Sequence, residues 1–133
     1  MSRRRVLDTN VLIRGWHRSA SRPLANASAE DARSWARKII DLYRSDAIVT
    51  PVDIEFRAAA RSQHELVLAR SFLAVFRIVD DGRVTIDDWS YARRLAEHAR
   101  PKPRQLGDCL VRALSNRAGY DVETLDGTFP RQL

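Results

Sequence analysis

The carboxylates Asp8, Glu55, Asp108 and Asp126 are the side chains of this sequence whose positions suggest shared chemistry. Asp8 and Asp126 directly follow apolar stretches, whereas Glu55 and Asp108 lie in the first turns of amphipathic stretches. Four carboxylates that converge cannot all stay ionised without a counter-charge, because like charges raise one another's pKa. The sequence offers no convergent lysine, so a hard divalent cation, Mg²⁺ or Mn²⁺, is the expected partner.

The charge of the chain indicates the class of substrate. Basic residues number 23 and acidic residues 17, so the net charge is +6, and nearly all of the positive charge is arginine. The planar guanidinium group pairs with phosphate oxygens, and surplus positive charge attracts a polyanion. On composition alone, a soluble protein that is merely rich in arginine fits equally well. Combined with an acidic site, the charge favours metal-assisted hydrolysis of a phosphodiester, with one ion or with two ions roughly 4 Å apart.

Other classes of site and location are disfavoured by the sequence. The single cysteine, Cys109, cannot form an internal disulfide, and His17, His64 and His98 lack metal-ligand spacing. These observations exclude a zinc site and a disulfide framework. No apolar stretch approaches the ~20 residues of a membrane span, so we expect a soluble cytoplasmic protein without a membrane partner. The length suits one domain over residues 1–133.

The expected elements are short apolar strands that alternate with amphipathic helices. Such alternation predicts an α/β fold with a parallel sheet of four strands and helices on both faces. In such a sheet the carboxyl ends of all strands lie at one edge, which is where ligands bind. Strands are expected at Arg5–Leu7, Ala47–Val49, Arg77–Val79 and Tyr120–Leu125, and helices from Val11, over Ser28–Tyr43, from Thr50, over Glu65–Phe76, over Thr85–Ala99 and over Gly107–Ala118.

Helical geometry separates the two acids of the helix that Thr50 is expected to cap. Asp53 falls on the solvated face, at ion-pair spacing from Arg57. Glu55 lies about 200° away, on the side expected to turn inward among small apolar residues. A carboxylate there is costly unless a cation meets it, so Glu55 is the better candidate for a functional role.

Several acids have an ordinary structural explanation at this stage. Asp108 fits a first-turn acid paired with Arg112, and Asp87 and Asp88 fit partners of a helix dipole. Asp80 and Asp81 precede a glycine, as in a simple turn. Asn10 is expected to cap the first helix.

Four stretches resemble the motifs of PIN-domain ribonucleases, especially the VapC toxins of bacterial toxin-antitoxin pairs. The resemblance covers nearly the whole chain and implies a three-layer α/β/α PIN-like domain, in which a fifth strand commonly follows the last motif. By this resemblance, metal-binding and catalytic acids fall at Asp8, Glu55, Asp108 and Asp126, and polar supporting residues at Thr9, Asn10 and Thr124. The stretches are Val6–Ile13, Thr50–Glu55, Leu106–Val111 and Val122–Phe129.

The resemblance also implies an activity and partners. It implies Mg²⁺-dependent endonucleolytic cleavage of RNA by a homodimer, which a cognate VapB-like antitoxin silences. Basic residues that suit phosphate contacts, or that are simply solvated charges, are Arg14, Arg61, Lys102, Arg104 and Arg112. The alternative is a non-catalytic or housekeeping PIN-fold protein that binds or processes RNA. An aspartyl-phosphate enzyme is disfavoured because the only lysines, at positions 38 and 102, are expected in a helix and a loop.

Overall fold

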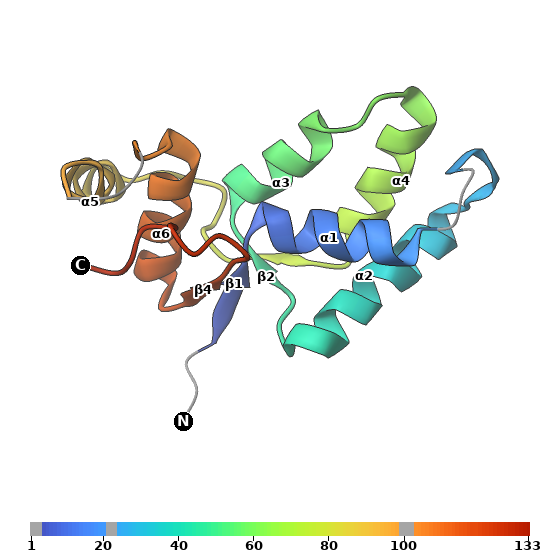
Figure 1. Ribbon diagram of the computed structural model, residues 1–133, viewed down its shortest axis with the longest axis horizontal. Helices are drawn as coiled ribbons and strands as arrows, with labels where there is room; N and C mark the ends of the chain where they lie inside the picture. Colours follow the sequence, from blue (N-terminus) through green and yellow to red (C-terminus); the bar gives the residue numbers. More distant parts are fainter. Residues whose placement is uncertain (1–3, 21–23, 99–102) are drawn as a thin grey trace.

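A four-stranded parallel sheet forms the centre of the computed structural model, which describes residues 4–20, 24–98 and 103–133 (Figure 1). The strands are β1 (Arg5–Leu7), β2 (Ala47–Ile48), β3 (Arg77–Ile78) and β4 (Asp121–Glu123), in the spatial order β3-β2-β1-β4. All three neighbouring pairs are parallel. The predicted parallel sheet is confirmed, and the described residues contain no fifth strand.

Helices cover the sheet and connect its strands. They are α1 (Thr9–Ser19), α2 (Ala29–Tyr43), α3 (Thr50–Ala58), α4 (Gln63–Leu73), α5 (Ile86–Ala96) and α6 (Leu106–Ala118), with a short 3₁₀ turn at Leu24–Asn26. Figure 1 shows α1 to α4 gathered on one side of the sheet and α5 and α6 on the other. This three-layer arrangement is the α/β/α fold expected from the sequence. None of the described helices is long and apolar enough to cross a membrane.

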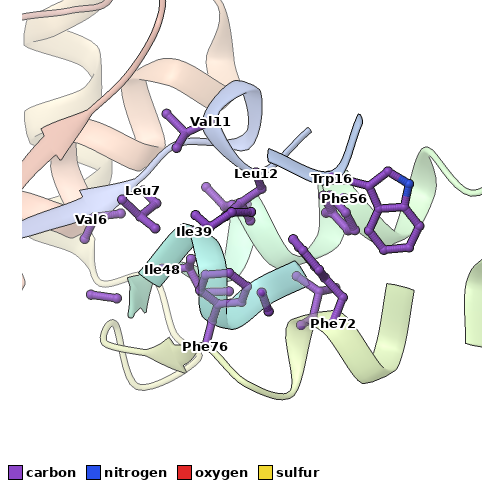
Figure 2. Packing of buried hydrophobic residues seen from close by; sticks show 14 of the residues in the cluster. Val6, Leu7, Val11, Leu12, Trp16, Ile39, Ile48, Phe56, Phe72 and Phe76 are labelled. Carbon is purple, nitrogen blue, oxygen red and sulfur yellow. The ribbon is translucent and has the colours of Figure 1, made fainter. Parts of the chain in front are cut away.

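An aromatic cluster holds α1 against α3 and α4 (Figure 2). The ring of Trp16 lies edge-on to Phe72, with centroids 5.1 Å apart, and Phe56 stacks on Phe72 at 4.8 Å. All three side chains are at most 6% exposed. Offset-stacked and edge-to-face pairs are the favoured aromatic geometries, so this cluster fixes the relative position of the helices that begin near Asp8 and contain Glu55.

The starts of α1 and α3 differ from the sequence expectation. The N-cap of α1 is Asp8 and not Asn10, because the Asp8 Oδ1 accepts a hydrogen bond from the Thr9 N–H at 2.8 Å. Helix α3 has Val49 at its N-cap, without a side-chain cap. Thr50 instead lies inside the helix, where its N–H and its hydroxyl donate to Asp80 at 2.9 and 2.8 Å.

Asp80 is therefore more than the turn residue that the sequence suggested. It is completely buried after β3, and it also accepts a hydrogen bond from the Gly82 N–H at 3.1 Å. A buried carboxylate is stable only when hydrogen bonds replace its water, and these three donors do so. Asp80 thus ties the end of β3 to the start of the helix that contains Glu55.

A partly buried ion pair attaches α5 to α6. Asp88 completes a capping box with Thr85, as its position in the first turn suggested, and its carboxylate also pairs with Arg117 at 2.9 Å. The same guanidinium donates to the carbonyl oxygens of Asp80 and Arg83 at 3.1 and 2.8 Å. These contacts fix α5 in place beside the helix that starts near Asp108.

Replacing Asp80 with alanine is expected to lower the free energy of unfolding by about 1–3 kcal/mol, because the Thr50 donors at the start of α3 lose a buried acceptor. Chemical denaturation of the purified variant measures this change. Asp81→Asn is the matched control, since Asp81 is exposed and asparagine tolerates its positive φ of 59°. Equal stability of the two variants would contradict the anchoring role of Asp80.

Candidate functional site

Asp8 lies at the carboxyl end of β1 and is only 6% exposed. Its Oδ2 accepts a hydrogen bond from the Thr124 hydroxyl at 2.9 Å, while its Oδ1 caps α1. Burial raises the pKa of the Asp8 carboxyl, and the negative charge of Asp126 adds to this effect, although the hydrogen bonds from Thr124 and Thr9 oppose it. The carboxylate is held in one orientation but lacks a compensating positive charge among these neighbours.

Asn10 and Thr124 connect the start of α1 to the loop after β4. The Asn10 amide donates to the Thr124 hydroxyl oxygen at 3.1 Å, and its carbonyl oxygen accepts from the Leu125 N–H at 3.1 Å. The Thr124 hydroxyl oxygen also accepts from the Asp126 N–H at 3.1 Å. This network brings the carboxylates of Asp8 and Asp126 to the same edge of the sheet, and it accounts for the polar character of both positions.

Asp126 is further oriented by Thr128, which the sequence reading did not select. One carboxylate oxygen of Asp126, Oδ1, accepts hydrogen bonds from the Thr128 N–H and hydroxyl at 2.9 and 2.7 Å. An aspartate followed two residues later by threonine is the usual signal for such a turn, so Thr128 was recognisable in principle.

Glu55 faces the edge of the sheet and not the core, which corrects the sequence expectation. The residue is exposed, and the buried positions of α3 are Val52 and Phe56. Its Oε2 accepts a hydrogen bond from the Thr9 hydroxyl at 3.2 Å, so its carboxylate end still lies beside the start of α1. Loss of water around this end raises the pKa of Glu55, and the charge of Asp8 adds to it.

The start of α6 approaches Glu55 closely at Gly107. A Cβ atom at this position would lie 2.9 Å from the Glu55 Oε1, which is closer than real Cβ contacts. A glycine here leaves room for the carboxylate next to the first turn of α6, where Asp108 lies. The direction of the Glu55 side chain thus depends on how α3 packs against its neighbours. The helical periodicity of α3 alone does not predict that packing.

Asp108 responds to the other three acids together. The pKa of Asp108 is raised to about 6, mostly by burial and then by the charges of Asp8, Asp126 and Glu55 in that order, while Arg104 acts in the opposite direction. Like charges produce such shifts only at close range, so the four acids share one electrostatic environment. Asp8, Glu55, Asp108 and Asp126, which come from segments spread over most of the chain, therefore lie near one another at the carboxyl edge of the sheet.

The side chains fit a hard divalent cation by their chemistry. All four donors are carboxylates, and the burial and neighbouring negative charge that raise the pKa values of Asp8, Glu55 and Asp108 are effects that a bound cation offsets. Within the described ranges, no group of three or more histidine, cysteine, aspartate or glutamate side chains is already close enough to hold an ion. The residues that would hold one are Asp8, Glu55, Asp108 and Asp126.

The basic residues named from the sequence occupy different environments. Arg14 and Arg61 are exposed, whereas Lys102 lies outside the described residues. Arg104 lies beside the acids, where its Nη1 donates to the Thr128 carbonyl oxygen at 2.8 Å.

Arg112 neither pairs with Asp108 nor is available for a phosphate contact, contrary to both sequence expectations. It is only 7% exposed and pairs with Asp121 at 2.8 Å, not with Asp108. Its Nε donates to the Pro130 carbonyl oxygen at 2.7 Å, and its guanidinium lies over the Phe129 ring. It therefore holds the C-terminal segment and is not presented to RNA.

The comparison with protein families supports what the geometry suggests. The family model described as PIN domain matches residues 5–132. No curated protein and no solved structure matches the chain significantly. The match spans all four strands and every acid of the candidate site, and the chain belongs to the PIN domain family.

Proposed function

We propose that this protein is a metal-dependent endoribonuclease and the toxin component of a VapC-type toxin-antitoxin pair. PIN domains are generally nucleases that act on nucleic acid. The observation that supports the proposal most directly is the shared electrostatic environment of four carboxylates at the sheet edge, in a chain of net charge +6. An acidic site surrounded by positive charge suits a phosphodiester substrate that reaches the acids through a cation.

The residues of the site have separable roles in this proposal. A bound Mg²⁺ or Mn²⁺ would activate water and neutralise charge that develops on the phosphate. Asp8 and Asp126 are the most rigid ligands, since hydrogen bonds from Thr124 and Thr128 orient them. Asp108, with a raised pKa near 6, is the carboxylate that takes up a proton most readily near neutral pH.

The remaining parts of the proposal concern organisation and partners. The chain forms one PIN-like domain over residues 1–133 and acts in the cytoplasm as a homodimer. A VapB-like antitoxin binds it and blocks the acidic site. Support for these points comes from the family and from the motif resemblance, and co-purification with the product of a neighbouring reading frame tests the antitoxin partner directly.

Asp8→Asn is expected to abolish cleavage of RNA and to raise the melting temperature of the metal-free protein. The substitution removes one repulsive charge, and asparagine keeps an acceptor for the Thr9 N–H. Asp41→Asn, an exposed position on α2, is the control for charge removal elsewhere. Gel analysis of RNA digestion, with and without chelator, and thermal melting are the measurements. A lower melting temperature for the Asp8 variant would argue against crowding of the acids.

Mg²⁺ or Mn²⁺ is expected to raise the melting temperature of the wild-type protein, because a ligand that binds only the folded state stabilises it. The shift should vanish in the double variant Asp8→Asn/Asp126→Asn. Calorimetry with Mn²⁺ alone gives the same answer without any RNA. A shift of equal size in the double variant would mean that the cation binds elsewhere on the protein.

The stability of the metal-free protein is expected to increase as the pH falls from about 7 towards 4. The folded-state pKa of Asp108, about 6, lies above its ordinary value of 3.8, so the folded state binds a proton more tightly than the unfolded state. The ionised Asp108 carboxylate lowers the free energy of unfolding fully above pH 6. This loss of stability is relieved as the pH falls through the folded-state pKa of Asp108. Asp108→Asn should flatten the pH dependence of the free energy of unfolding in denaturation experiments. An unchanged pH profile in this variant would refute the prediction.

A further inference from the structure

A concave site lies between α5 and the start of α6. It has a volume of about 280 Å³, and its floor includes the buried residues Ala92 and Cys109. Trp89 and Arg93 of α5 form one wall, and the residues around the start of α6 form the other. The acids of the candidate active site do not line it.

The aromatic wall of this pocket is unusual for the protein. Trp89 is 42% exposed, whereas the other two tryptophans, Trp16 and Trp35, are each 5% exposed. A large aromatic side chain left open beside polar groups offers a flat surface on which a nucleobase can stack. Phosphate-binding groups nearby would make this surface selective for nucleotides.

The charge of the pocket meets that requirement. Its charged lining residues are Arg93, which is exposed, and Arg104, and no acidic residue of the described chain lines it. The Nε of Arg104 is buried and has no hydrogen-bond partner among the described residues, although its Nη1 donates to the Thr128 carbonyl oxygen. Gln105, the N-cap of α6, makes no side-chain hydrogen bond to the helix. These donors and the positive end of a 13-residue helix favour an anion.

The pocket and the acidic site share the first turn of α6. Leu106 and Cys109 line the pocket, while Asp108 lies between them and faces the acids. Arg104 also links the two sites. It lines the pocket, and it donates a hydrogen bond to Thr128, which in turn orients Asp126. An RNA strand that crosses the start of α6 would therefore contact the two sites with neighbouring nucleotides.

We propose that this pocket binds an unpaired nucleotide of the RNA substrate next to the cleaved phosphodiester. The base stacks on Trp89, and Arg93 and Arg104 contact the adjoining phosphate. The inference rests on the proposed nuclease function and adds a position at which the enzyme selects single-stranded RNA over a continuous duplex, whose bases are not available for stacking.

The first test measures binding of a short, unstructured, fluorescently labelled RNA to the Asp8→Asn protein, which keeps the RNA intact. Adding Trp89→Ala should weaken binding about 5- to 100-fold, in line with the loss of one base–aromatic stack. Trp89→Phe should restore most of the affinity. Ile86→Ala is the matched control, because Ile86 is 83% exposed on the same helix and does not line the pocket.

Tryptophan fluorescence gives a second readout that a merely structural role would not change. RNA should quench the emission of the Asp8→Asn protein, because Trp89 is the one exposed tryptophan among the three, all of which lie in the described part of the chain. The quenching should disappear in the Trp89→Phe variant even though RNA still binds. Arg93→Gln should reduce the salt dependence of binding by about one phosphate contact, whereas Arg94→Gln, whose guanidinium lies over the Tyr91 ring, should change it less.

An RNA affinity that does not change in the Trp89→Ala variant would overturn the proposal. If the oligomeric state of that variant also shifted in sedimentation, the surface would be an interface between copies of the chain. If instead the wild type failed to cleave RNA while Trp89 governed RNA binding, the nuclease function would fail and the pocket would remain an RNA-binding site.

Discussion

Burial of acidic side chains at the carboxyl edge of the sheet, together with repulsion among them, is the constraint on which this structure depends. Asp8, Glu55, Asp108 and Asp126 come from four separate segments, and the pKa values of Asp8, Glu55 and Asp108 are raised first by burial and also by neighbouring negative charge. A folded protein of this size has little stability to spare for such a cluster. The rest of the molecule therefore has to hold these side chains together against their own electrostatic preference.

Three sets of interactions provide that support. The Thr124 hydroxyl joins the ends of β1 and β4, since it donates to Asp8 and accepts from Asn10 and from the Asp126 N–H. The aromatic cluster around Phe72 packs α1 against α3 and α4. Asp80 fixes the start of α3 from the end of β3. None of these groups belongs to the proposed metal ligands, yet each determines where one or more of the ligands lie.

The arginines divide into a structural group and a surface group, so net charge alone overstates the positive surface. Arg112 and Arg117 are engaged with Asp121 and Asp88 and with backbone carbonyl oxygens. Arg104 is intermediate: its Nη1 donates to the Thr128 carbonyl oxygen beside the acids, and its Nε has no hydrogen-bond partner in the part of the chain that the structure describes. Positive charge near the acidic edge thus comes from a few specific side chains. The position of these side chains says more about substrate binding than the net charge of the chain does.

The parallel sheet, the end of β1 that positions Asp8 and the pairing of Asp53 with Arg57 follow from local periodicity and spacing, so the sequence alone predicts them. Strand β4, however, ends at Glu123 and not at Leu125 as expected, so Asp126 lies in the loop after it. The orientation of Glu55 depends on how α3 packs, because helical periodicity gives the angle between residues but not which face turns inward. The roles of Asp80, Arg112 and Thr128 likewise depend on partners elsewhere in the structure, and a charged residue in a turn or helix looks the same in sequence whether it is solvated or buried against such a partner.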